Sequence, residues 1–110
     1  MTRLEEELKT ELLAVYDKAS TIGYYPKYFK RMLTSSNPQY NKGPVGTVRH
    51  LMLGSVSPQS GFQRLRKAGK LEWTVEWLIA KSPKWHPLFQ NSGWVIQKAQ
   101  ARIRDAEKAN

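Results

Sequence analysis

Hydrophobic residues recur every three or four positions along most of the chain, which is the spacing of amphipathic helices. The N-terminal segment 3–22 keeps this spacing over five turns. Its apolar positions are Leu4, Leu8, Leu12, Val15, Ala19 and Ile22. Further helices are predicted over about 26–34, 44–53, 60–68, 71–81 and 91–108, and no segment sustains the period of two that a strand requires. The sequence therefore predicts an all-α protein, a compact single-domain bundle of five or six helices over residues 1–110.

Local signals mark where these helices begin and end. Two pairs have the spacing of a capping box: Thr2 with Glu5, and Ser60 with Gln63. Gly69 follows the last apolar position of one helix, where a glycine can take a positive φ without strain. The segment 35–43 is rich in Ser, Asn, Pro and Gly, so it is predicted to be a loop.

The segment 60–89 holds three of the four tryptophans and is predicted to form the centre of the core. Trp73 and Trp77 belong to the predicted helix 71–81, which is apolar nearly all round, and we expect both to be buried. For Trp85 and Trp94, which stand near predicted helix starts, core and ligand-binding roles both stay open.

The C-terminal part of the chain is predicted to form a short irregular or single-turn segment and a final helix. The irregular segment should hold three side chains in the core: Trp85, Leu88 and Phe89. The final helix is predicted to have an apolar inner side, formed by Trp94, Val95, Ala99, Ile103 and Ala106. Its outer side is predicted to be basic, formed by Lys98, Arg102 and Arg104.

The central stretch also contains the spaced pattern S-G-F-x-x-L-x-x-x-G-[KR]-L-x-x-T-V-E-x-L, followed by an aromatic residue and a Leu-Phe pair. The matching residues are Ser60, Gly61, Phe62, Leu65, Gly69, Lys70, Leu71, Thr74, Val75, Glu76, Leu78, Trp85, Leu88 and Phe89. An upstream element is similar, formed by Tyr25, Tyr28, Phe29, Met32 and Leu33. On these residues the chain resembles a family of small helical bacterial proteins of unknown function. The resemblance implies a helical fold and no reaction, cofactor or catalytic residue.

Charge is distributed unevenly along the chain. The formal net charge is +9, and no acidic residue stands between Asp17 and Glu72. Ten basic residues fall in that span: Lys18, Lys27, Lys30, Arg31, Lys42, Arg49, Arg64, Arg66, Lys67 and Lys70. A folded segment with only positive charge repels itself, so this distribution favours an anionic partner.

Cysteine content leaves the compartment unconstrained, and a reducing cytoplasm is the simplest expectation. The chain contains no cysteine, which excludes disulfide bonds and thiolate metal sites. No apolar run approaches the roughly 20 residues of a membrane span, and the acidic amphipathic start differs from a signal peptide. We expect a cytoplasmic protein that does not enter a membrane.

The residue types that usually carry catalysis do not form a recognisable constellation. His50 and His86 are far apart in the sequence, whereas a metal site needs three or four converging ligands. Glu72 and Glu76 have a spacing that paired catalytic carboxylates can use, but carboxylates at a helix start also match the helix dipole. Basic residues available to pair with them are Arg64, Arg66 and Lys70. No nucleophile motif or phosphate-binding loop is present. We expect no enzyme activity, no cofactor and no bound metal.

Nucleic acid is the anionic partner that the sequence favours. The predicted phosphate contacts are Lys27, Lys30, Arg31, Lys42, Arg49, Arg64, Arg66 and Lys67. Residues predicted to stack on unpaired bases are Tyr24, Tyr40 and His50. The helix predicted over 44–53 offers only Arg49 and His50 for reading bases in a groove, which argues against recognition of a specific duplex sequence.

Two other classes remain open. The protein could be an interaction module, an adaptor or inhibitor that binds an acidic protein, because the same charge would serve that partner. An exposed tryptophan such as Trp94 would fit a homodimer interface. An enzyme is the third class, and the sequence offers no residues to support it.

Overall fold

The computed structural model describes residues 1–53 and 60–108, and it is all-helical across them. The α-helices are α1 (Arg3–Ser20), α2 (Lys27–Thr34), α3 (Gly43–Met52), α4 (Ser60–Lys67), α5 (Val75–Lys81) and α6 (Trp94–Lys108). Two 3₁₀ segments are η1 (Leu71–Trp73) and η2 (Pro83–Ser92). The described residues contain no strand, which confirms the all-α prediction. With the 3₁₀ segments included, there are more helical elements than the five or six expected.

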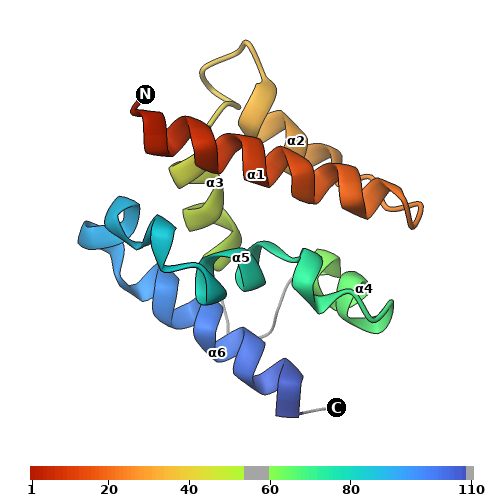
Figure 1. The fold of residues 1–110 in the computed structure, drawn as a ribbon. Coiled ribbons are helices and arrows are strands. Elements are labelled where there is room, and N and C mark those ends of the chain that lie inside the picture. The colour runs from red at the N-terminus through yellow and green to blue at the C-terminus, as the bar shows by residue number, and fades with distance from the viewer. Residues whose placement is uncertain (54–59, 109–110) are drawn as a thin grey trace.

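The helices pack into a compact body in which α3 lies in the middle (Figure 1). On one side α3 packs against α1 and α2, and on the other it packs against α6, which lies alongside α5. The radius of gyration is 13.2 Å, close to the roughly 13 Å of a folded 100-residue domain. No helix in the part of the chain that the structure describes is both long enough and apolar enough to cross a membrane.

The main core draws side chains from α1, α2, α3, α5, η2 and α6. Its buried members are Leu8, Leu12, Phe29, Leu33, Val48, Met52, Val75, Ile79, Trp85, Phe89, Val95 and Ala99. A smaller cluster joins α4 to the C-terminal half of α6 through Phe62, Ile103 and Ala106. The apolar positions predicted for the N-terminal helix therefore face the core, because Leu8, Leu12 and Ala19 are buried along α1.

Several helix ends form as their local signals predict. The Thr2 side chain accepts from the Glu5 backbone amide, and the Glu5 side chain accepts from Thr2, which completes a capping box. Gly69 follows α4 with φ 74°, a conformation that any side chain would strain. The second predicted capping box depends on the Ser60 side chain, which lies outside the described residues.

The loop between α2 and α3 is closed by hydrogen bonds at its base. Asn41 Nδ2 donates to the Ser35 carbonyl (2.8 Å), and Asn41 Oδ1 accepts from the Gly43 amide (2.9 Å). The Lys42 amide donates to the Met32 carbonyl (2.8 Å). These bonds fix where α3 begins and satisfy backbone groups that the irregular segment would otherwise leave unpaired.

The predicted helix 71–81 is broken in two, which corrects the sequence prediction. Thr74 is extended (φ −85°, ψ 155°) and caps α5, because its hydroxyl accepts from the Trp77 amide (3.1 Å). The break turns both expected core tryptophans partly outward, so Trp73 and Trp77 are only half-buried. Trp85 in η2 is the tryptophan that is buried, at 3% exposure.

Three predictions for the C-terminal helix are also wrong. It begins at Trp94 rather than at 91 or 92, because the 3₁₀ segment η2 continues to Ser92. Trp94 therefore stands in the first turn, 40% exposed, rather than inward. Arg102, expected on the outer basic side, is buried at 1% exposure. The other four inward positions of α6 are buried as predicted: Val95, Ala99, Ile103 and Ala106.

Candidate functional site

The basic residues predicted to contact phosphate lie on α2, α3 and α4 and in the loop before α3. We call them the basic set: Lys27, Lys30, Arg31, Lys42, Arg49, Arg64, Arg66 and Lys67. All are exposed except Arg66, which is half-buried. Within the described residues, no member of the basic set forms an ion pair with an acidic side chain. Their positive charge is therefore not neutralised locally.

Three members of the basic set contact tyrosine rings instead of acidic side chains. The Lys30 ammonium lies 4.8 Å from the centre of the Tyr16 ring on α1. The guanidinium of Arg31 lies 5.2 Å from the Tyr40 ring, and that of Arg64 lies 5.1 Å from the Tyr24 ring. Such cation–π contacts orient a cation without cancelling its charge. A planar guanidinium on a tyrosine also offers a surface on which an unpaired base can stack.

The basic set does not form one continuous cluster. Tyr24, just before α2, packs under Arg64, so the start of α2 and α4 come together. Arg49 instead extends toward the end of η2, where its Nε donates to Ser92 Oγ (3.2 Å). Arg66 is engaged on its own helix, donating to Gln63 Oε1 (3.0 Å). The structure thus gathers part of the predicted interface around α2 and α4 and directs Arg49 elsewhere.

The contact between Tyr24 and α4 depends on a glycine. A Cβ built on Gly61 would lie 2.6 Å from the Tyr24 hydroxyl oxygen, so no larger residue fits without moving that ring. The next nearest atom, Tyr24 Cζ, would be at 3.4 Å, which is ordinary van der Waals contact. Gly61 therefore lets Tyr24 lie close against α4, with its ring also under Arg64.

A pocket of about 270 Å³ opens between α1, α2, α3, α4 and the start of α5. Most of its wall is apolar, formed by Val15, Ala19, Pro26, Phe29, Met32, Leu51, Phe62, Leu65 and Val75. The side chains with polar groups are Tyr24, Lys27, Tyr28, His50, Thr74 and Glu76. Two of the three residues predicted to stack on bases, Tyr24 and His50, line this pocket together with Lys27 of the basic set. Tyr40, the third, lies outside it, against Arg31.

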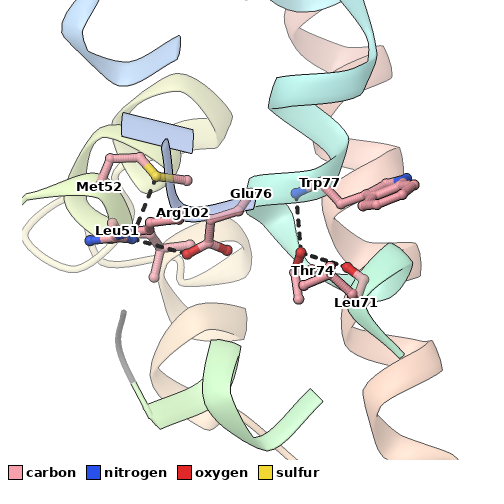
Figure 2. Close-up of polar contacts among 7 residues, drawn as sticks. All are labelled: Leu51, Met52, Leu71, Thr74, Glu76, Trp77 and Arg102. Carbon is pink, nitrogen blue, oxygen red and sulfur yellow. Dashed lines mark hydrogen bonds and ion pairs between the residues drawn. The ribbon is translucent and has the colours of Figure 1, made fainter. Parts of the chain in front are cut away.

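Glu76 lies in this pocket wall and forms a buried ion pair with Arg102 of α6 (Figure 2). Arg102 Nη1 lies 3.0 Å from Glu76 Oε2 and also donates to the Leu51 carbonyl (3.0 Å) and toward Met52 Sδ (3.6 Å). The Glu76 side chain is 7% exposed and that of Arg102 is wholly buried. Burial raises the pKa of Glu76, and its backbone hydrogen bond and Arg102 offset this only in part. The partners expected for Glu76, Arg64, Arg66 and Lys70, do not pair with it.

The sequence did carry a signal for the burial of Arg102. Val95, Ala99 and Ala106 are spaced so that position 102 completes the same helical stripe. The charge of arginine favoured the solvent side in the sequence interpretation. A cation in an apolar stripe instead predicts a buried carboxylate partner, because an isolated buried charge is strongly unfavourable.

The two histidines lie in different surroundings. The His50 ring lies 5.7 Å from the Tyr28 ring at the edge of the pocket. His86 Nε2 lies 3.1 Å from the Ile79 carbonyl oxygen, which assigns the proton to that nitrogen. Among the described residues, no three His, Asp or Glu side chains are grouped so that they could hold a metal ion.

Comparison with protein-family models, curated proteins and solved structures finds no match to this chain. The resemblance to a bacterial family of helical proteins therefore stays a prediction. The functional interpretation rests on the chain's own geometry.

Proposed function

We propose that this chain binds nucleic acid through the basic set around α2 and α4 and that it catalyses no reaction. The main observation in support is that none of these cations forms an ion pair with an acidic side chain of the described residues. Each phosphate contact releases condensed counterions, so several such cations supply salt-dependent affinity for a nucleic-acid backbone.

The aromatic residues favour unpaired strands over a duplex. The ring of Tyr24 contacts the guanidinium of Arg64, and the ring of Tyr40 contacts that of Arg31. Bases stack on aromatic and guanidinium planes only where they are not paired within a helix. The α3 helix would have to enter a groove, but the Nε of its exposed Arg49 is already bonded to Ser92. Single-stranded DNA or RNA is therefore the proposed ligand.

Fluorescence polarisation with labelled single- and double-stranded DNA and RNA, across a salt series, tests this proposal. We expect tighter binding to single strands and a linear fall of log affinity with log salt concentration. The triple variant Lys27→Glu, Lys30→Glu, Arg31→Glu should abolish binding while its melting temperature stays near that of the wild type, since all three side chains are exposed.

A second triple variant controls for net charge alone. Arg3→Glu, Arg104→Glu, Lys108→Glu makes the same change of charge at exposed positions outside the basic set. It should retain most of the affinity. Equal loss in both triple variants would mean that only the overall charge matters, and full binding by the α2 variant would refute the assigned surface.

An acidic protein is the alternative partner. Tyr25 and Tyr28 are 57% and 54% exposed beside the basic set, and exposed tyrosines are common in protein interfaces. Trp94, at 40% exposure, and Leu53, at 56%, would suit a homodimer. A pull-down with and without nuclease separates these cases: a partner retained after nuclease treatment supports the interaction module. Sedimentation of the purified chain tests the homodimer.

A further inference from the structure

We propose that the pocket between α1, α2, α3, α4 and α5 holds one unstacked nucleobase whose exocyclic amino group donates to Glu76. This inference rests on the proposed nucleic-acid function and extends it from the phosphate backbone to the base. It favours adenine, cytosine and guanine over thymine and uracil, because an exocyclic amino group presents two donor hydrogens, whereas thymine and uracil offer only a ring N3–H set between two carbonyl oxygens that repel a carboxylate.

The size of the pocket suits a single heterocycle. An apolar cavity of about 150 Å³ accepts benzene, and pockets for drug-sized ligands begin near 300 Å³. At about 270 Å³, this pocket lies between the two. It can hold one ring system with its attachment point directed outward.

The walls suit the flat faces of a base. Phe29 of α2 and Phe62 and Leu65 of α4 belong to the apolar lining. An unpaired base buries its apolar faces against such side chains and leaves only its edge in need of polar partners. One buried polar group in the wall is the carboxylate of Glu76, whose side chain is only 7% exposed.

The carboxylate of Glu76 can accept a further hydrogen bond from a ligand. Its Oε2 accepts from Arg102, a backbone hydrogen bond also reaches the carboxylate, and no other side chain of the described residues is bonded to it. An ionised carboxylate has about four acceptor positions, so these bonds do not exhaust it. Because Arg102 already balances its charge, Glu76 suits a neutral donor rather than a second cation. An exocyclic amino group is such a donor.

The rim of the pocket connects it to the proposed phosphate contacts. Lys27 belongs both to the basic set and to the pocket lining, with Tyr28 and His50 close by. A base inserted toward Glu76 leaves its sugar and phosphates at this rim, where an ammonium group can contact them. The same strand can therefore lie on the basic set and place one base in the pocket.

The inference can be tested by changing one base of an oligonucleotide and measuring its affinity. The probes are a ten-residue all-thymine DNA strand and the same strand with one central cytosine, adenine, guanine or abasic site. We expect at least one amino-bearing base to tighten binding about tenfold, since a hydrogen bond to a charged group contributes that much or more. The abasic strand should bind no better than all-thymine DNA.

The outcomes separate the two proposals. Salt-dependent binding that is equal for all five strands would overturn the pocket and leave the phosphate surface intact. Absence of binding by every strand, and by the matching RNA, would overturn both.

The same inference can be tested by changing side chains of α1. Val15→Phe adds a ring at a half-buried pocket position and should remove the preference for an amino-bearing base without weakening all-thymine binding. Leu13→Phe, on the same helix and outside the pocket, is its control. Thermal melting shows whether each variant folds.

Glu76→Gln gives an independent readout. Its amide oxygen can still accept from Arg102, and its NH₂ group then faces the pocket as a donor. The preference for the amino-bearing base over thymine should therefore disappear or reverse, because thymine offers a carbonyl oxygen in place of the amino group. An unchanged preference in Glu76→Gln would refute the role of Glu76.

Discussion

Arg102 lies fully buried with its Nη1 atom 3.0 Å from Glu76 Oε2 and 3.0 Å from the carbonyl oxygen of Leu51. One guanidinium thus joins α6, α5 and the end of α3 inside the protein (Figure 2). The pair is the main polar feature of a largely apolar interior, and its energetics can be tested by removing one partner or both.

Replacing only Arg102 or only Glu76 should lower the free energy of unfolding more than replacing both. Arg102→Met leaves the Glu76 carboxylate buried without its cation, which should lower the free energy of unfolding by about 3–5 kcal/mol. Adding Glu76→Leu removes the stranded charge, so the double variant should recover at least half of that loss. Urea denaturation of the wild type, both single variants and the double variant gives the comparison. Additive losses would show that the two side chains are not energetically coupled.

Stability should depend on pH through Glu76. Burial raises the pKa of this carboxyl above its ordinary value of 4.5 in the folded chain, whereas the unfolded chain keeps that ordinary value. Between the two values the folded state binds more protons than the unfolded state. The contribution of Glu76 is therefore fully present below about pH 4.5 and is lost as pH rises through its folded-state pKa.

The matching measurement is the melting temperature of the wild type and Glu76→Gln from pH 4 upward. Because the amide side chain of this variant does not titrate, the wild type should lose stability relative to the variant as pH rises through this window. A relative gain over the same window would mean that Arg102 lowers the pKa of Glu76 below its ordinary value.

Trp85 should be the tryptophan that matters most for stability. It is 3% exposed and belongs to the main core, so Trp85→Ala should cost about 3–5 kcal/mol. Trp94→Ala is the matched control, since Trp94 is 40% exposed and should cost less than about 1 kcal/mol. Chemical denaturation measures the loss of unfolding free energy in each variant. Equal losses would contradict the burial seen in the structure.

The effect of Gly61→Ala should change sign with the residue at position 24. In the wild type, the new Cβ meets the Tyr24 hydroxyl at 2.6 Å, so displacement of the ring should cost about 1–3 kcal/mol. In a Tyr24→Phe background that oxygen is absent. Gly61→Ala should then stabilise α4 by up to about 1 kcal/mol, because alanine is the better helix former. Thermal denaturation of the wild type, both single variants and the double variant measures the two effects.

Sequence reasoning predicted the elements whose signals are local. The spacing of Leu8 and Leu12, the Thr2 capping box and the positive φ of Gly69 all follow from neighbouring residues. The apolar run around Thr74 resembles one continuous helix, so the sequence does not predict the break there. The Thr74 hydroxyl caps α5 only because the chain turns there, which the apolar pattern does not record.

The sequence predicts which types of residue form the candidate site, but it does not predict how they are arranged in space. The acid-free span indicated the basic set, and Tyr24 and His50 were named as stacking residues. The pocket needs side chains from five helices, so no local pattern could indicate it. The charge of Arg102 favours the surface although its position falls in an apolar stripe, and the partner that allows its burial, Glu76, is 26 residues away.

The hydrogen bond from Arg102 to Leu51 has a consequence for the order of folding. The last carbonyls of a helix have no partner within it, and here one of them is satisfied by a side chain 51 residues further along the chain. The last turn of α3 is therefore completed only when α6 has docked. Its amides should gain protection from hydrogen exchange together with those of α6, later than the amides of α1, so that the middle helix of the bundle is finished only when α6 joins it.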